Sequence, residues 1–300
     1  MRLPFRKSGG SRPPAPFVVG VGRSGTTLLR LMLDAHSELA MPPETGFLPD
    51  LIKAARPDDA TVDDLVHAVT SHRKWGDFPL DEADLRGRWE AVDPIKPRPV
   101  VRGFYELYAE AQGKPRWGDK TPGYTMYMRR ISRVLPEARF IHVIRDGRAV
   151  AHSRMKTLSL RPVEMEKVAA RWRRRLRKAQ RQGSRLDHYL EIRYEDLVRD
   201  PEGTLRTVCE FVDLPWEDGM LSYHQRSEER LAELDRDIPA WGDKLPRSAE
   251  SRMALHQQTT KPPDPARIDR WRSEMSDDDL ATFEREAGEL LAELGYETGR

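Results

Sequence analysis

Three short segments have the hydrophobic pattern of β-strands, and each is followed by a helical pattern. They lie near residues 16–20, 139–144 and 189–193. The first contains the apolar run Phe17–Val19, and the second contains the largely β-branched run Phe140–Ile144. Short apolar runs of this kind are typical of buried strands. Their alternation with helices predicts an α/β fold, in which a parallel sheet is flanked by helices on both faces.

Two long helices are predicted from periodicity and capping. In residues 165–179 apolar positions recur at helical spacing while the opposite face is basic, which indicates an amphipathic helix with a buried stripe. The stripe consists of Met165, Val168, Ala169, Trp172, Leu176 and Ala179. A last helix is expected from Ser276 to Leu294, because a Ser N-cap followed by three Asp residues suits the positive end of a helix.

The remaining regions differ in composition and suggest how the chain is organised. Residues 1–15 are basic and rich in Pro and Gly, so we predict a disordered lead-in. Residues 16–297 are expected to form one α/β domain. Within it, residues 47–115 predict a helical excursion over the carboxyl edge of the sheet that shapes a substrate pocket. Residues 217–262 are polar with little apolar periodicity, and we predict a mobile flap there.

Composition and charge exclude several classes of protein. The chain has 300 residues and a net charge of only +2. No window approaches the ~18 apolar residues of a membrane-spanning helix, so no transmembrane segment is expected. Cys209 is the sole cysteine, which rules out an intramolecular disulfide and favours a buried apolar filler in a reducing, cytoplasmic compartment. No His or Cys pair has ligand spacing, so no metal site is expected. The basic stretch 161–185 is tempting as a nucleic-acid site, but a solvated helix face or a rim attracting an anionic ligand explains it better.

The loop between Gly20 and Thr27 carries the most informative chemistry. It joins the first strand to a segment of strong helix formers, Leu28–Leu33. A strand, a glycine-rich loop and a helix N-terminus together form an anion cradle, because backbone N–H groups and the helix dipole point at the ligand. The spacing nearly satisfies the nucleoside-triphosphatase pattern G-x4-G-K-[ST], yet Thr26 stands where that pattern requires lysine. The loop is therefore predicted to bind a phosphate-like group. An ordinary glycine turn is the alternative.

This loop, Gly-Arg-Ser-Gly-Thr-Thr, resembles the 5'-phosphosulfate loop of sulfotransferases that use 3'-phosphoadenosine 5'-phosphosulfate (PAPS). In that family a Lys or Arg precedes Ser-Gly-Thr-Thr, and no metal is needed. A sulfuryl group carries less charge than a γ-phosphoryl group, so fixed N–H donors and one or two cations can stabilise its transfer. The resemblance implies a set of residues that hold the phosphosulfate, namely Arg23, Ser24, Gly25, Thr26 and Thr27.

A second segment supports the same resemblance. Arg145 ends the predicted strand 139–144, and Ser153 follows in the next helical pattern. In the family, an arginine and a serine in these places grip the 3'-phosphate of the donor. A guanidinium fork with a hydroxyl beside it suits a phosphate in a partly closed site. The alternative is a structural ion pair between Arg145 and Asp146.

Further matches follow in the same order along the chain, over roughly residues 16 to 297. Tyr194 matches a tyrosine near the cofactor, and Lys261 resembles the lysine of a loop that closes over it. The arginine in the first loop, followed by Ala-His-Ser and then Glu44-Thr, resembles the tyrosylprotein-sulfotransferase-like branch. The match is incomplete, because Thr157 stands where relatives often carry an arginine after the serine. Lys156 and Arg154 are the candidate substitutes.

The resemblance also implies catalytic roles. Glu44 matches the general base of the tyrosylprotein branch, and His36 is a weaker rival. Lys120 and Arg23 would neutralise charge on the bridging oxygen and the sulfuryl group. For Lys120, the alternative is a surface lysine paired with Asp119.

The expected function is therefore sulfuryl transfer from PAPS to an acceptor hydroxyl, with 3'-phosphoadenosine 5'-phosphate (PAP) as product. A P-loop kinase or nucleotide phosphotransferase is the second reading, and a non-catalytic binding module is the third. Neither nucleic acid nor a membrane segment is expected as a partner. The acceptor stays open among carbohydrate, lipid, small-molecule and peptidyl-tyrosine hydroxyls, and so does the oligomeric state, with a homodimer as one alternative.

Overall fold

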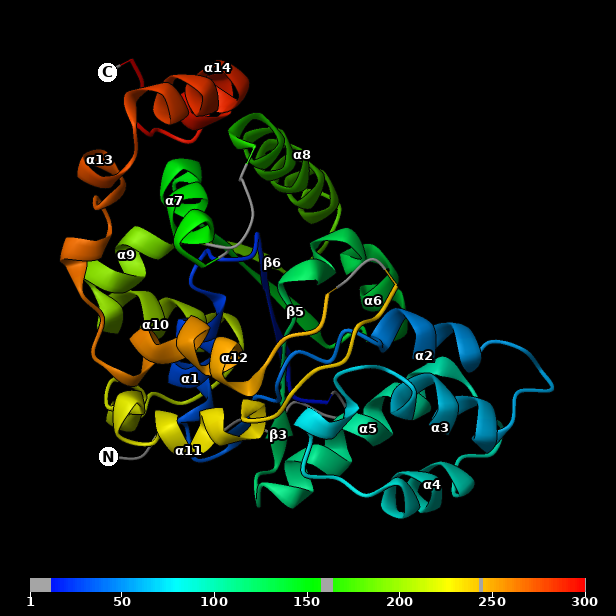
Figure 1. Cartoon of the computed structure of the whole chain (residues 1–300). Coiled ribbons are helices and arrows are strands. Elements are labelled where there is room, and N and C mark those ends of the chain that lie inside the picture. Colours follow the sequence, from blue (N-terminus) through cyan, green and yellow to red (C-terminus); the bar gives the residue numbers. More distant parts are fainter. Residues whose placement is uncertain (1–11, 158–163, 243–244, 300) are drawn as a thin grey trace.

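A parallel four-stranded sheet lies at the centre of the molecule, as the strand and helix pattern predicts (Figure 1). The computed structural model describes residues 12–157, 164–242 and 245–299. The strand order is β4-β1-β5-β6, and all three pairings are parallel. The strands are β1 (Ala15–Gly20), β4 (Asp119–Lys120), β5 (Ala138–Ile144) and β6 (Tyr189–Arg193). A two-stranded parallel sheet lies beside it, formed by β2 (Leu39–Ala40) and β3 (Arg116–Trp117).

The central pair, β1 and β5, is buried on both faces. All six residues of β1 are buried, and Phe17 is paired with Phe140 in the register of the sheet. Alternate side chains point to opposite faces, so Phe17 and Val18 contribute to different hydrophobic clusters. A continuous apolar strand of this kind needs helices on both sides, which confirms the predicted layer arrangement.

The helices form two layers and a third group near the carboxyl ends of the strands. The Phe17 face packs against α2 (Leu48–Ala54), α3 (Val62–Thr70), α4 (Glu82–Glu90), α5 (Pro97–Ala111) and α6 (Met128–Val134). The Val18 face packs against α1 (Thr26–Asp34), α9 (Tyr194–Arg199), α10 (Pro201–Phe211) and α11 (Ser227–Leu231). The third group consists of α7 (Gly147–Thr157), α8 (Met165–Gly183) and α14 (Asp277–Glu293). Two short helices, α12 (Ala249–His256) and α13 (Trp271–Glu274), precede α14.

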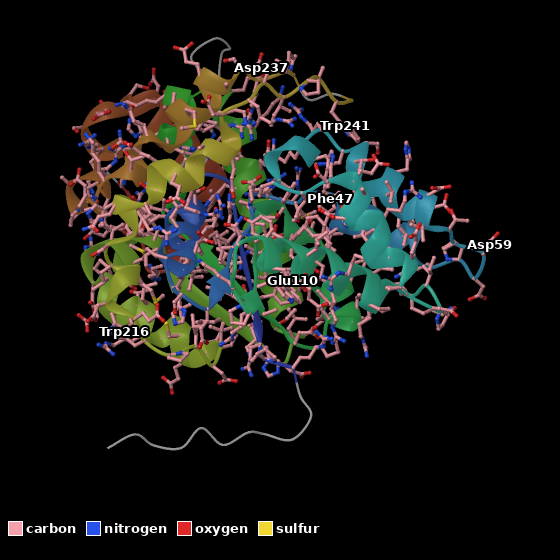
Figure 2. All side chains as sticks on the ribbon, turned by 90° about the horizontal axis from the view of Figure 1, so that it is seen from below. Phe47, Asp59, Glu110, Trp216, Asp237 and Trp241 are labelled. Atoms are coloured by element: carbon pink, nitrogen blue, oxygen red, sulfur yellow. The ribbon has the colours of Figure 1, made fainter. Side chains whose placement is uncertain are left out.

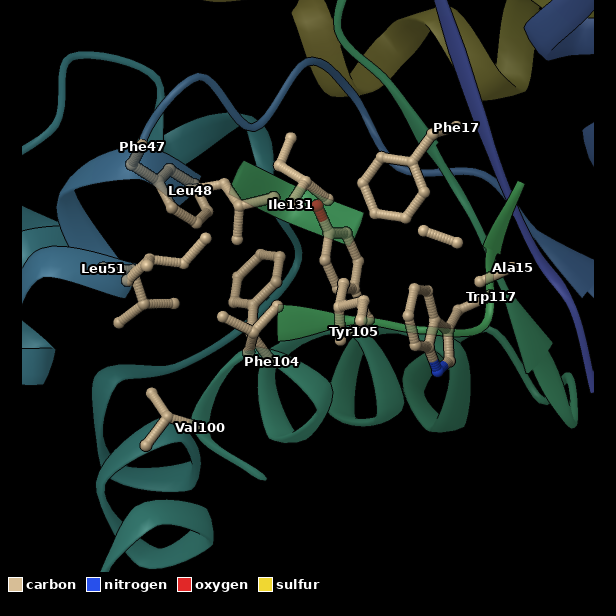
Figure 3. Close-up of a cluster of buried hydrophobic side chains, with 14 of the residues drawn as sticks. Ala15, Phe17, Phe47, Leu48, Leu51, Val100, Phe104, Tyr105, Trp117 and Ile131 are labelled. Atoms are coloured by element: carbon tan, nitrogen blue, oxygen red, sulfur yellow. The ribbon is translucent and has the colours of Figure 1, made fainter. Parts of the chain in front are cut away.

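The excursion over residues 47–115 is helical, but its position differs from the expectation. It packs on one face of the sheet through an aromatic cluster, in which Tyr105 of α5 stacks on Trp117 at 4.7 Å between ring centroids and meets Phe17 edge-on (Figure 3). It reaches the carboxyl edge of the sheet through Lys74, which follows α3. The apolar side of α5 explains the difference, because burying these rings on the sheet face removes far more apolar surface from water than an edge position would.

The segment 217–262 is more structured than its polar composition suggests. It forms α11, α12 and short 3-10 turns, and it buries Met220, Tyr223, Leu231 and Leu234 against the Val18 face. These apolar residues sit on single turns with irregular spacing, so no helical period connects them. Ile238 and Arg247 form an antiparallel bridge. Between them in sequence is Trp241, which is labelled in Figure 2, and its ring centroid lies 5.3 Å from that of His72 in the excursion. The proposed closing motion stays a prediction.

Other sequence predictions can be compared directly. The predicted apolar stripe of α8 is confirmed, since Trp172 is buried and its ring centroid lies 5.8 Å from that of Phe283 in α14. Ser276 caps α14 by accepting a hydrogen bond from the Asp279 backbone N–H at 3.1 Å. Cys209 is buried. The lead-in lies largely outside the described residues, which begin at residue 12. Among the described helices, none is long and apolar enough to cross a membrane.

Candidate active site

The glycine-rich loop lies at the carboxyl end of β1 and leads into α1. Arg23 and Gly25 have positive φ angles of 76° and 92°, and the helix begins at Thr26. A Cβ atom at Gly25 would lie 2.3 Å from Cδ2 of Tyr194. Glycine is therefore required at this position for two reasons: the left-handed backbone conformation and the close approach of the Tyr194 ring. The N–H groups of the first turn have no partner within the helix. Ser24 and Thr26 are buried against this turn, which leaves the loop shaped as an anion cradle.

Four residues predicted to bind the donor meet at this loop. The Arg23 Nε–H donates to the Ser153 hydroxyl at 3.1 Å, and the Arg145 guanidinium donates to the Arg23 carbonyl at 3.0 Å. The same guanidinium lies over the Tyr194 ring, 4.0 Å from its centroid. The residues come from the ends of β1, β5 and β6 and from α7, which a parallel sheet brings to one edge.

Within the described part of the chain, the hydrogen bonds of Arg23 and Arg145 go to neutral oxygen atoms and not to carboxylates. Burial, together with the neighbouring Arg145 and Arg247, lowers the pKa of Arg23. The Nε of Arg145 is buried and has no hydrogen-bond partner among the described residues. Asp146, the alternative partner of Arg145, instead pairs with Arg148 at 2.8 Å. A cluster of guanidinium groups with unused donors suits a polyanionic ligand, so the residues present fit the phosphates of PAPS.

Glu44 forms ion pairs with two lysines in the neighbouring part of the site. Its Oε1 accepts from Lys120 at 2.9 Å, and its Oε2 accepts from Lys74 at 2.5 Å. Lys120 also lies 3.4 Å from the hydroxyl of Thr27, which links the carboxylate to the loop. The structure therefore brings Glu44, Lys120 and Thr27 together, and it adds Lys74.

The protonation states of this group follow from its surroundings. Burial alone would raise the pKa of Glu44, but the ion pairs with Lys120 and Lys74 hold it well below its usual range. Burial lowers the pKa of Lys120, and the attraction of Glu44 offsets this only in part. The carboxylate is thus ionised at neutral pH and can accept a proton.

A buried polar network supports the strand that carries Lys120. Asp119 accepts from the hydroxyls of Thr45 at 2.8 Å and Tyr105 at 2.9 Å, and Thr45 also contacts the Tyr124 hydroxyl at 2.6 Å. Burial raises the pKa of Asp119 to about 6, despite these hydrogen bonds. The alternative interpretation of Lys120 as a surface lysine paired with Asp119 is wrong, because Lys120 is buried and pairs with Glu44.

A cleft of about 910 Å³ opens beside the loop and reaches α8. Glu44 and Thr27 line it at one side. Many of the other lining residues are cationic, including Arg154, Arg171, Arg174, Arg175 and Arg247. Of the two substitutes considered for the family arginine at Thr157, Arg154 lines the cleft, whereas Lys156 pairs with Glu274. The structure therefore favours Arg154 for that role.

Two candidates from the sequence lie elsewhere. His36 is buried beyond the far end of α1, where its Nε2 is 2.8 Å from the Pro215 carbonyl oxygen, so it does not line the cleft. Lys261 is exposed, and its carbonyl accepts from the Tyr223 hydroxyl at 2.6 Å. Its proposed contact with the donor stays a prediction.

Sequence reasoning missed Lys74, Arg247 and His256, which line a small cavity of about 90 Å³ behind Glu44. Burial and the nearby cations Lys120 and Arg23 lower the pKa of His256 to about 3, so the imidazole is neutral. These residues stand in the excursion and in the 217–262 segment, outside any motif, and only a contact map could have found them. In the described ranges, no three His, Cys, Asp or Glu side chains are grouped to hold a metal ion.

The known proteins to which this chain is similar are sulfotransferases. The model of the sulfotransferase family matches residues 14–218. Protein-tyrosine sulfotransferase 1 of Danio rerio is 27% identical over 71% of this chain and 56% of its own length. Protein-tyrosine sulfotransferase A of Caenorhabditis elegans is 26% identical over 95% of this chain and 67% of its own length. The chain thus spans between about half and two thirds of these relatives.

Solved structures show the same fold. The sulfotransferase domain from the Synechococcus PCC 7002 olefin synthase superposes with a TM-score of 0.64 at 25% identity, covering 99% of this chain and all of that domain. The sulfotransferase domain from the curacin biosynthetic pathway has a TM-score of 0.62 at 21% identity, covering 97% of this chain and all of that domain. With its family match over residues 14–218, the chain belongs to the sulfotransferase family.

Proposed function

We propose that this protein transfers a sulfuryl group from PAPS to an acceptor hydroxyl. The observation that carries the proposal is the meeting of Arg23, Arg145, Ser153 and Tyr194 around a loop that presents backbone donors. A loop and helix N-terminus suit the 5'-phosphosulfate. The guanidinium of Arg145, with Ser153 nearby, suits the 3'-phosphate, and Tyr194 supports that guanidinium from below.

The transfer needs one proton acceptor and cations where negative charge develops. The acceptor oxygen forms a bond to sulfur while the bond from sulfur to the 5'-phosphate oxygen breaks, and the electron pair leaves with PAP. We assign the acceptor's proton to Glu44, which is ionised and lines the cleft. Lys120 and Arg23 stabilise the charge on the leaving oxygen and the sulfuryl oxygens.

The acceptor enters through the cleft beside α8. The named relatives are protein-tyrosine sulfotransferases, which makes a peptidyl tyrosine the first acceptor to test. A phenol is also the most acidic of the hydroxyls considered, so its proton is the easiest for a weakly basic carboxylate to accept. Carbohydrate, lipid and other small hydroxyl compounds are the comparison arms.

The test is an acceptor screen with PAPS labelled in its sulfuryl group. We expect label in a tyrosine-containing peptide and release of PAP, with activity retained in EDTA because side-chain cations supply the positive charge. Transfer of phosphate from ATP that EDTA abolishes would instead support the P-loop kinase reading, in which Mg²⁺ is required. Tight PAP binding without transfer to any hydroxyl class would support a binding module.

A further inference from the structure

The two lysines of Glu44 approach the carboxylate from the same side. Glu44 lines both the cleft and the small cavity behind it, whereas Lys74 and Lys120 line only the cavity. Each lysine takes a different carboxylate oxygen, Lys120 at Oε1 and Lys74 at Oε2. The remaining lone pairs of both oxygens are therefore left for a group in the cleft. One lysine alone would leave the carboxylate free to rotate about its last bond.

The two lysines belong to different parts of the fold. Lys120 is in β4, and its ammonium also contacts the Thr27 hydroxyl of the donor loop. Lys74 is in the helical excursion, where its backbone N–H donates to the His72 ring at 3.3 Å. Its ammonium has Glu44 as its ion-pair partner. Lys74 thus acts on the carboxylate without contacting the donor loop.

The stretch that carries Lys74 is held firmly in place. Asp77, three residues later, is buried and pairs with Arg252 of α12 at 2.7 Å. The Arg236 guanidinium donates to the Arg73 carbonyl at 3.2 Å. Both partners come from the 217–262 segment, so this segment fixes the stretch around Lys74, although none of its described residues is hydrogen-bonded to Glu44. A lysine on a fixed backbone can orient its partner at a lower entropic cost.

We propose that Lys74 is a positioning residue for the transfer reaction, which turns the Glu44 carboxylate toward the acceptor and sets its basicity. The inference rests on the proposed function, in which Glu44 accepts the proton. Lys120 serves the donor side, and Lys74 serves the acceptor side. The other charged or titratable side chains around the cavity are Arg30, Asp77, Arg247, Arg252 and His256.

The expected pH effect has a definite sign. Lys74 helps to hold the pKa of Glu44 below its usual range, against the effect of burial. Replacing Lys74 by a neutral side chain removes one attraction and one hydrogen bond to the ionised form, so the pKa of Glu44 rises. The acid limb of the kcat profile, where Glu44 becomes protonated and inactive, then moves to higher pH. Removing one opposite charge at this distance shifts such a limb by about one pH unit or more.

The experiment compares Lys74→Met with Lys74→Arg and with Lys53→Met. Lys53 is an exposed lysine of α2 in the same excursion, so it controls for the loss of one charge. We expect Lys74→Met to move the acid limb upward by about one unit and to leave PAP affinity within about twofold. Lys74→Arg restores the charge and should return the limb toward its original pH, while Lys53→Met should leave it unchanged.

A second readout does not depend on turnover. The carboxyl pKa of Glu44 can be measured by infrared difference spectroscopy, with Glu44→Gln identifying the band. The pKa of Glu44 should rise in Lys74→Met and should stay unchanged in Lys53→Met. If wild type transfers sulfuryl and Glu44→Gln does not, yet Lys74→Met leaves both the limb and the band in place, the inference is overturned while the proposed function stands. If Lys74→Met does not fold, Lys74→Gln replaces it in the same comparison.

Discussion

The donor side and the acceptor side of the site are built in different ways. On the proposed donor side, Arg23 and Gly25 come from one short loop, Thr27 lies in the first turn of α1, and Arg145 follows a neighbouring strand of the same sheet. On the acceptor side, Glu44 lies on an irregular stretch after β2 and depends on Lys74, which is held by residues from the far end of the chain. The first side is local and tied to strand ends. The second is assembled from distant segments.

The difference teaches which substitutions should affect binding and which should affect chemistry. Donor contacts rest on backbone geometry and guanidinium groups that persist without the acceptor side. The proposed base, Glu44, forms ion pairs with Lys74 of the excursion and Lys120 of β4, and the stretch of Lys74 is tied to α12 through Asp77 and Arg252. We therefore expect donor affinity and turnover to respond separately to changes on the two sides.

The largest expected effect is that of Glu44→Gln on turnover. The amide cannot take the acceptor's proton, so kcat should fall by roughly 10²–10⁴-fold, the usual contribution of a positioned base. PAP affinity, measured by calorimetry, should stay within about twofold, because the assigned donor contacts do not involve Glu44. Near-normal kcat would remove Glu44 as the base and would make the neutral His256 the next candidate.

Arg145→Ala should weaken binding of the donor nucleotide without affecting the residues around Glu44. Losing a charge-assisted contact to the 3'-phosphate costs about 2–3 kcal/mol, which is about 30- to 150-fold in PAP affinity. Binding of AMP, which lacks that phosphate, should change little, so the variant should lose its preference for PAP. Titrations of both nucleotides against wild type and Arg145→Ala provide the measurement. A parallel loss for AMP would show that Arg145 supports the loop rather than the 3'-phosphate.

Asp119→Asn tests the support beneath the acceptor side through stability. The pKa of Asp119 is raised to about 6 in the folded chain, above its unfolded value, so the folded state binds more protons between these values. Wild-type stability should therefore fall as pH rises from 4 to 6, by about 2 kcal/mol relative to Asp119→Asn. Urea unfolding of both proteins across this range measures the difference. If the free energies of unfolding of the two proteins changed with pH in the same way, the pKa of Asp119 would not be raised in the folded state.

The smallest expected effect is that of Lys261→Ala. Lys261 is exposed, and an exposed ion pair contributes at most about 1 kcal/mol, so PAP affinity should fall about two- to fivefold. PAP should also slow hydrogen exchange across residues 245–262 in wild type, and this protection should be lost in the variant. Lys53→Ala serves as the control. Unchanged protection would remove Lys261 from the donor site.

The sequence alone predicted three strands of the central sheet and marked the anion loop, but it did not predict β4 or the β2-β3 pair. Strand patterns near residues 16–20 and 139–144 placed the two central strands, and glycine at position 25 with Arg23 beside it marked the anion loop. These features are readable because they are local: a strand needs a short apolar run, and a left-handed backbone favours glycine. Arg145 was assigned through the family resemblance, and it meets the loop because the carboxyl ends of parallel strands share one edge.

Only the tertiary structure decided what surrounds Glu44. The sequence marked Glu44 and Lys120 through a family resemblance, yet no local pattern indicated Lys74 or His256. Most of the excursion packs on a face of the sheet, and it reaches the carboxyl edge through Lys74. The aromatic rings of α5 pack on the sheet face. The 217–262 segment buries apolar residues on short turns, and these residues do not recur at helical spacing in the sequence. A carboxylate's basicity depends on the charges within a few ångströms of it. Which charges those are depends on how distant segments pack, so a linear pattern cannot reveal them.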